Sequence, residues 1–261
     1  MTATRRFEAG PATIDIDAAA GGRIVSLTVA GEELLRQRVA DPLGWGCYPM
    51  APWAGRLREG RFVFGARRYS VPRNMPPHAI HGTVLKRAWE WVADDTLACP
   101  LGPDWPFPGR VEQRFLLCPQ ALRIQLEVQA LAQPFAASLG LHPWFRRRLG
   151  RGGELALDFA ADWRYARIDG IPTGELLPPG PRPWDDCFTA LQHAPRLRWP
   201  GVVSLQLSSN HPQWVVYDEP EDALCVEPLT APPNALNGVA HLVTPLRPLT
   251  LEFRIDWDIE G

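Results

Sequence analysis

Three short segments place a histidine or a glutamate where acid–base chemistry is possible. His81 ends the run PPHAIH before Gly82, and His142 interrupts the apolar run LGLHPWF just before a proline. Glu227 lies inside the apolar run LCVEPL, where a carboxylate is costly to bury unless it is paired or functional. If its surroundings are dry, the pKa of Glu227 rises and the side chain becomes a usable general base. Each residue also has an ordinary structural interpretation: a loop histidine, a satisfied core histidine and a salt-bridged glutamate.

Two further residues have the chemistry to hold the hydroxyl groups of a polar ligand. Arg56 follows Gly55 in the segment APWAGRL, and Asp185 follows a tryptophan in WDDCF. Arginine and aspartate are common partners of sugar hydroxyls, but they are also the usual partners of a surface ion pair.

The elements that would position these residues are predicted to be short strands. The 28 prolines and 22 glycines among 261 residues punctuate the chain, and between them apolar and polar residues alternate with a period of two. Alternating or β-rich segments cover 14–17, 24–29, 61–64, 111–117, 122–129, 155–159, 214–217 and 249–255. The best helix candidate is the short segment 32–38. Many short strands predict an all-β protein of packed sheets, and we expect one domain over residues 1–261, with 178–181 as a loop.

Composition and charge exclude several other classes of protein. With 27 Lys and Arg against 29 Asp and Glu, the chain has no basic excess for nucleic acid. It has no stretch of about 20 apolar residues for a membrane span, and the N-terminal residues, which lack an apolar run, lead us to expect no secretory signal. The cysteines form no CxxC pair, which indicates a reducing compartment, by default the cytoplasm. They are Cys47, Cys99, Cys118, Cys187 and Cys225.

From about Gly21 to its C-terminus the chain resembles the aldose 1-epimerase (galactose mutarotase-like) family. The resemblance rests on the order of several short motifs, each permissive when taken alone. They are GGRIVS (21–26), PMAPWAGRLREGRFVF (49–64), HGTVLKRAW (81–89), LGLHPWF (139–145), WDDCF (184–188) and CVEPLTAPPNALN (225–237).

The resemblance implies a fold, an activity and a set of roles. The fold is a large antiparallel β-sandwich (supersandwich) with the site in a cleft across one sheet. The activity is interconversion of the α and β anomers of a hexose, without metal or cofactor, by a monomer or homodimer whose partner is a small-molecule sugar. Glu227 is the implied general base, His142 the general acid and His81 a ligand near the ring oxygen, with Arg56 and Asp185 as hydroxyl contacts. Gly55 stands where the family often has asparagine, so one hydroxyl contact is expected to be missing.

The implied roles predict how activity depends on pH. Opening a hemiacetal removes the proton of the anomeric hydroxyl and protonates the ring oxygen, so Glu227 would be ionised and His142 protonated before the reaction. Ordinary pKa values of about 4.3 and about 6.5 then predict a bell-shaped profile, with Glu227 controlling the acidic limb and His142 the basic limb.

Trp53 and Trp144 are candidates to stack on the sugar, although core packing is the expectation for each of the 11 tryptophans.

Three alternatives stay open from the sequence. His78, His81, His142 and Glu227 are possible ligands of iron or manganese in a metalloenzyme. Residues 146–148 and Arg151 are arginines that could hold the phosphate of a hexose 6-phosphate, which would make the protein a hexose-6-phosphate 1-epimerase. A non-catalytic carbohydrate-binding protein would share the fold without needing an acid and a base.

Overall fold

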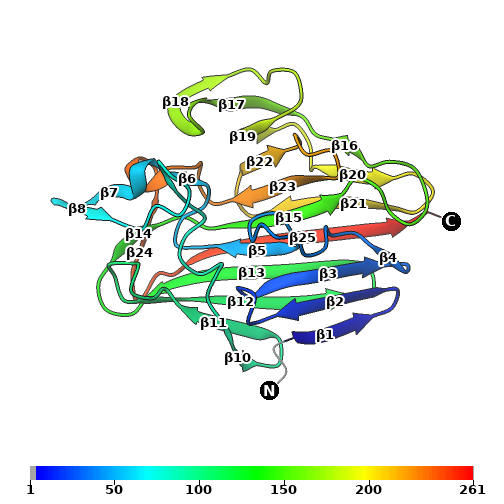
Figure 1. Ribbon diagram of the computed structural model, residues 1–261, viewed down its shortest axis with the longest axis horizontal. Coiled ribbons are helices and arrows are strands. Elements are labelled where there is room, and N and C mark those ends of the chain that lie inside the picture. The colour runs from blue at the N-terminus through cyan, green and yellow to red at the C-terminus, as the bar shows by residue number, and fades with distance from the viewer. Residues whose placement is uncertain (1–3, 261) are drawn as a thin grey trace.

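Two large antiparallel sheets account for most of the structure, a computed structural model that describes residues 4–260 (Figure 1). The larger sheet consists, in spatial order, of β1 (Thr4–Ala9), β2 (Ala12–Asp17), β3 (Arg23–Val29), β5 (Cys47–Met50), β15 (Gly140–Arg146), β23 (Ala223–Leu229), β22 (Gln213–Tyr217), β19 (Asp185–Leu191), β17 (Ala161–Ile168) and β18 (Ile171–Leu177), with β4 (Glu32–Glu33) paired to β3.

The second sheet has eight strands. Its spatial order is β10 (Glu90–Ala93), β11 (Thr96–Pro100), β12 (Gly109–Cys118), β13 (Ala121–Ala130), β25 (Leu249–Ile259), β21 (Val203–Ser209), β20 (Arg196–Trp199) and β16 (Ala156–Asp158). Three two-stranded pairs complete the fold: β6 (Arg56–Leu57) with β9 (Ala79–Ile80), β7 (Arg61–Phe64) with β8 (Arg67–Ser70), and β14 (Phe135–Ala137) with β24 (His241–Val243).

The core lies between the two large sheets and follows from the alternation in the sequence. On β13, the residues Leu122, Ile124, Leu126 and Val128 are completely buried and belong to one apolar cluster to which both sheets contribute. The residues between them are more exposed because successive side chains point to opposite faces of a strand. The predicted strand at 122–129 is therefore confirmed, and so is the all-β class.

The two central strands of the larger sheet are buried on both faces. Every residue of β23 is buried, and so are the first six of the seven residues of β15. Leu141 and Phe145 join the core between the sheets, whereas Trp144 and Cys225 belong to a separate cluster on the outer face. This arrangement explains why both segments read as continuous apolar runs.

The short helix predicted for 32–38 is wrong. Glu32 and Glu33 form β4, and the Glu33 carboxylate accepts hydrogen bonds from the backbone N–H groups of Leu27 and Leu35. Leu34 and Leu35 are buried, and the backbone of Leu34 bonds to β3, so packing against the sheet outweighs local helix preference. Helical structure in residues 4–260 is limited to two 3₁₀ turns, η1 (Arg58–Gly60) and η2 (Ala235–Asn237).

The proline-rich loop at 178–181 does not divide the larger sheet. Strands β17 and β18 precede this loop and β19, β22 and β23 follow it, yet all five belong to that sheet. This continuity supports our proposal of one domain over 1–261. No helix among the described residues is long and apolar enough to span a membrane.

Replacing Leu126 with alanine should lower the free energy of unfolding by about 2–5 kcal/mol because it leaves a cavity in the core between the sheets. Leu116, on the neighbouring strand β12 and 55% exposed, provides the matched control. Leu116→Ala should change stability by no more than about 0.5 kcal/mol in the same urea titration. Equal losses in the two variants would contradict the placement of the core.

Candidate active site

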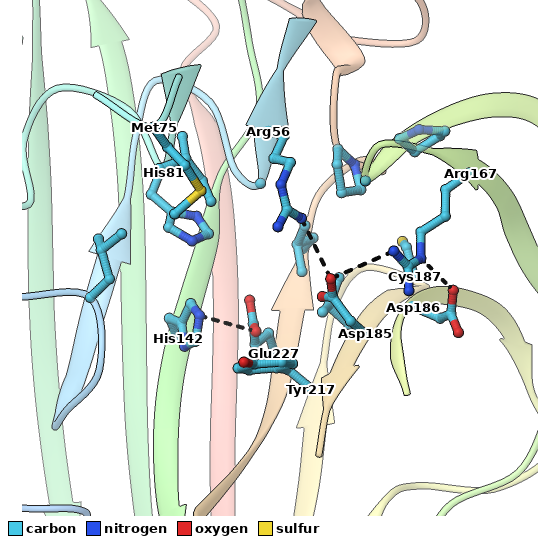
Figure 2. Close-up of a pocket in the computed structure, with 18 of the residues that line it drawn as sticks. Arg56, Met75, His81, His142, Arg167, Asp185, Asp186, Cys187, Tyr217 and Glu227 are labelled. Carbon is cyan, nitrogen blue, oxygen red and sulfur yellow. Dashed lines mark hydrogen bonds and ion pairs between the residues drawn. The ribbon is translucent and has the colours of Figure 1, made fainter. Parts of the chain in front are cut away.

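His142 and Glu227 face each other across two neighbouring strands. The register of β15 and β23 pairs Gly140 with Leu229 and Trp144 with Cys225, so His142 lies opposite Glu227. Alternation directs both side chains to the outer face of the larger sheet, away from the core. The His142 Nε2 and Glu227 Oε1 atoms are 3.2 Å apart, and the side chains are only 7% and 4% exposed (Figure 2). An acid–base pair therefore lies in a nearly dry environment.

His81 reaches the same place on a tightly constrained backbone. It has a positive φ of 59°, and its backbone N–H donates a hydrogen bond to the Gly55 carbonyl. Gly82 has a φ of 75°, and a Cβ atom there would lie 1.8 Å from the Ala51 carbonyl oxygen, so only glycine fits. The His81 ring is perpendicular to the His142 ring, with 5.2 Å between the centroids, and Figure 2 shows it beside His142 and above the pair.

Arg56 and Asp185 form the opposite wall. A guanidinium nitrogen of Arg56, at the start of β6, lies 3.6 Å from a carboxylate oxygen of Asp185, at the start of β19. Arg167, which we did not predict, lies 3.7 Å from Asp185 and donates a 2.9 Å hydrogen bond to Asp186. Its place in a polar strand, β17, contains no signal that distinguishes it from the many surface arginines.

All five predicted residues line one cavity of about 260 Å³. This volume is below the roughly 300–1,000 Å³ of sites for drug-sized ligands, and it suits a single small ring. Tyr217 and Trp144 also line the cavity, whereas Trp53 packs in the core between the sheets. The expectation of core packing is thus confirmed for Trp53, while Trp144 contributes to the cavity wall.

Burial decides the charge state of the pair and corrects our expectation. Burial lowers the pKa of His142 well below 6.5, and His81, when it is protonated, acts in the same direction. Burial also raises the pKa of Glu227 well above 4.5, with a smaller contribution from Asp185 that Arg56 opposes. Both shifts favour the uncharged form of each group, so a proton held by the pair favours Glu227 over His142.

This result reverses the predicted assignment of the two pH limbs. Protonation of His142 now belongs to the acidic side and ionisation of Glu227 to the basic side. Both limbs are properties of the coupled pair.

The predicted set of four metal ligands is not assembled. The Nδ1 atom of His78 accepts a hydrogen bond from the backbone N–H of Glu59, and His78 does not line the cavity. Within residues 4–260, the group close enough to hold a metal is instead His142, Cys225 and Glu227, whose ligand atoms lie within 4.8 Å of one another. Nitrogen, sulfur and oxygen donors of this kind suit zinc better than iron or manganese.

The arginine-rich segment after His142 lies outside the cavity. Residues 146–148 line a separate groove. Arg147 donates hydrogen bonds to the carbonyls of Asp218 and Pro220, Arg148 pairs with Glu154, and Arg151 pairs with Glu32.

Comparison with known proteins identifies the family. The family model described as aldose 1-epimerase matches residues 18–196. The chain belongs to the aldose 1-epimerase family. The matched range contains Arg56, His81, His142 and Asp185, whereas Glu227 lies beyond it.

Solved structures show the same fold at low sequence identity, which confirms the predicted galactose mutarotase-like sandwich. A galactose mutarotase-like protein from Clostridium acetobutylicum is 18% identical with a TM-score of 0.84, and the match covers 97% of this chain and 94% of that one. The galactose 1-epimerase of Lactobacillus acidophilus is 15% identical with a TM-score of 0.79, and the match covers 98% of this chain and 93% of that one.

A curated relative matches a shorter part of this family member. The uncharacterized protein YphB of Escherichia coli is 32% identical in an alignment 107 residues long, which covers 38% of this chain and 36% of that protein. The chain is thus aligned to little more than a third of that relative's length.

The departure at Gly55 has a structural reason. Gly55 has a φ of 68°, and a Cβ atom at this position would lie 2.7 Å from the ring of Pro233, which also lines the cavity. An asparagine side chain would require Pro233 to move.

We expect His81 to make the protein less stable in acid. Burial lowers its pKa from 6.5 to about 3, so between these values the unfolded chain binds a proton that the folded protein does not. Stability should therefore fall as the pH falls from about 6.5 to about 3, by up to about 1.4 kcal/mol per pH unit from this residue. In His81→Asn, which tolerates the left-handed backbone, urea unfolding at several pH values should show a shallower loss. Parallel curves for the two proteins would contradict the buried neutral state.

Proposed function

We propose that this protein is an aldose 1-epimerase (mutarotase) that interconverts the α and β anomers of an unphosphorylated aldose, such as a hexose. The observation that carries the proposal is the pair of His142 and Glu227, 3.2 Å apart in a nearly dry cavity that suits one sugar ring. The family membership indicates an isomerase acting on a sugar and agrees with this interpretation.

The reaction needs one proton donor and one proton acceptor. Binding of a polar sugar brings hydroxyl groups into the cavity, and these groups favour the charged form of the pair. Transfer of the shared proton from Glu227 to His142 across 3.2 Å then creates a carboxylate base and an imidazolium acid without exchange with solvent.

In our proposal Glu227 removes the proton of the anomeric hydroxyl while His142 protonates the ring oxygen, which breaks the bond between the ring oxygen and C1. Rotation about the bond between C1 and C2 presents the other face of the aldehyde. Reclosure with both proton transfers reversed forms the other anomer. His81 donates to or accepts from the sugar near the ring oxygen, and Arg56 and Asp185 hold hydroxyl groups.

The charges of the cavity favour a sugar without phosphate. Two guanidinium groups, Arg56 and Arg167, line the cavity, and each lies within 4 Å of an aspartate carboxylate. The acidic side chains that line the cavity outnumber them and are Asp41, Asp185, Asp186, Glu219 and Glu227. A phosphate dianion would meet more negative than positive charge, and the arginines at 146–148 lie in another groove.

A purely carbohydrate-binding role explains less of the site. Binding alone needs hydroxyl partners such as Arg56 and Asp185, but it gains nothing from burying a proton donor and a proton acceptor side by side.

The five cysteines are all unpaired, which agrees with a reducing compartment, and we propose the cytoplasm.

The wild-type protein should accelerate the mutarotation of freshly dissolved α-glucose or α-galactose in polarimetry. Glucose 6-phosphate should react at least about tenfold less efficiently, in kcat/KM, because its phosphate is repelled by the acidic lining. A preference for the phosphorylated sugar would favour the hexose-6-phosphate 1-epimerase. Binding of the sugars without any acceleration would favour the carbohydrate-binding protein.

Proton transfer alone needs no metal, so dialysis against a strong chelator should leave the mutarotation rate unchanged. The control is a sample dialysed without chelator and assayed beside it. Loss of activity on chelation, with recovery on adding back zinc, would instead assign a catalytic metal to the group of His142, Cys225 and Glu227.

A further inference from the structure

Within residues 4–260, the ring of His142 lacks the hydrogen bond from its second nitrogen that usually orients a catalytic histidine. A working histidine commonly donates its second ring nitrogen to a carboxylate or carbonyl, which fixes its orientation. In the described structure the His142 Nδ1 atom is buried and has no hydrogen-bond partner. Two aromatic rings enclose the imidazole instead: Tyr48 is stacked on it with 4.7 Å between centroids and Trp144 with 5.4 Å.

A single carbonyl oxygen anchors both of these rings. The Tyr48 hydroxyl donates a 3.0 Å hydrogen bond to the Leu43 carbonyl oxygen, and the Trp144 indole N–H donates a 2.8 Å hydrogen bond to the same atom. The spacing and tilt of the two rings around His142 therefore depend on where the loop 42–45 holds Leu43. We call these two rings and this loop the aromatic clamp.

Arginines from two other segments hold the loop of the clamp by its backbone. The Arg23 guanidinium donates hydrogen bonds to the Pro42 and Trp45 carbonyls, and Arg36 donates one to the Gly44 carbonyl. Arg23 lies 4.5 Å from the centroid of the Tyr48 ring and 4.1 Å from that of Trp45. Arg23 thus contacts both the loop and one ring of the clamp.

Arg23 is an unusual residue to find in this place. It is 2% exposed, and no described carboxylate lies within 4.0 Å of its guanidinium. Burying a charge without an ionic partner is costly unless other groups replace water. Here backbone carbonyls and the faces of two aromatic rings do so, and an apolar residue would fill the space without that cost. The cost points to a role beyond packing.

We propose that Arg23 is a positioning residue of the active site, which holds the aromatic clamp and thereby fixes the ring of His142 opposite Glu227. This inference rests on the proposed epimerase function for its kinetic consequences, but the orientation of His142 is measurable without any activity. Arg23 does not touch the cavity, and its effect reaches the sugar only through Tyr48, Leu43 and His142.

The charge of Arg23 has a second, smaller effect that separates it from a structural residue. The ionisable groups that face His142 are Glu227 and Cys225 from β23, Tyr48 from β5 and His81 from the segment after β9, and Arg23 lies behind Tyr48. Burial lowers the pKa of His142 most, and the positive charge of Arg23 lowers it further, as His81 does when it is protonated. Removing the charge at position 23 should therefore ease protonation of His142.

The test compares Arg23→Lys, which keeps the charge but loses the planar guanidinium group and its several N–H donors, with Arg23→Met, which loses both the charge and the donors. In mutarotation assays both variants should lower kcat about tenfold or more, because a misplaced catalytic group costs up to about a hundredfold, while KM changes by less than about threefold. The matched control is Arg5→Lys. Arg5 also lies over a tryptophan, at 4.0 Å from the ring of Trp91, and bonds to two backbone carbonyls, but far from the cavity. It should retain full activity.

The same variants are compared by NMR of the histidine ring signals, with His142 assigned by the loss of its signal in His142→Gln. Both Arg23 variants should shift or broaden the His142 signal, and only Arg23→Met should raise the pH at which it titrates. Tyr48→Phe and Trp144→Phe, which each remove one hydrogen bond to the Leu43 carbonyl, should shift the same signal. These two variants test the clamp if Arg23→Met does not fold.

Three outcomes separate the possibilities. Unchanged kcat and unchanged His142 signals in folded Arg23→Lys, or in both clamp variants, would overturn the proposal. A lower melting temperature with normal kcat and a normal His142 titration would make Arg23 merely structural and would also overturn it. If the wild type shows no epimerase activity, the proposed function fails, and the NMR comparison still decides the role of Arg23.

Discussion

Burial of an acid and a base side by side is the constraint on which the rest of this structure depends. His142 and Glu227 lie on the middle strands of the larger sheet. One face of these strands packs against the core, and the segments that carry His81 and Arg56 cover the other face. A dry environment disfavours charge on either group, so their proton is kept within the pair. The cavity wall and the backbone at His81 enclose this pair, and in our proposal the aromatic clamp keeps it aligned.

Much of the fold follows from local pattern. The segments at 122–129 and 249–255 alternate strictly, and each forms a strand whose apolar side fills the core between the sheets. The segment 32–38 shows where local pattern fails. Its charged and leucine residues suit a helix in isolation, but the backbone N–H of Arg36 donates a hydrogen bond to the Trp144 carbonyl on β15, more than 100 residues away along the chain, and no local window of sequence contains that partner.

Two active-site candidates could be found because buried polar residues in apolar runs are rare, whereas His81, Arg56 and Asp185 were selected by the order of motifs in the family resemblance. Glu227 and His142 interrupt such runs, and all five predicted residues line one cavity. Arg167 could not be found, because its role depends on how β17 pairs with β19 at the edge of the sheet. The protonation state was wrong for a related reason: an ordinary pKa describes a group in water, and the degree of burial is known only once the sheets are assembled. The roles that we propose for Tyr48 and Arg23 depend on ring stacking and on hydrogen bonds to backbone carbonyls, which leave no mark in sequence spacing.

The mutarotation rate of Glu227→Gln tests the central claim most directly. The substitution keeps the shape of the side chain and its neighbourhood with His142 but removes the group that can exchange a proton. With the folded state verified by circular dichroism, polarimetry of freshly dissolved α-glucose should show a rate at least about a hundredfold below that of the wild type, close to the uncatalysed reaction. A folded Glu227→Gln protein that retains a near-normal rate would contradict the account.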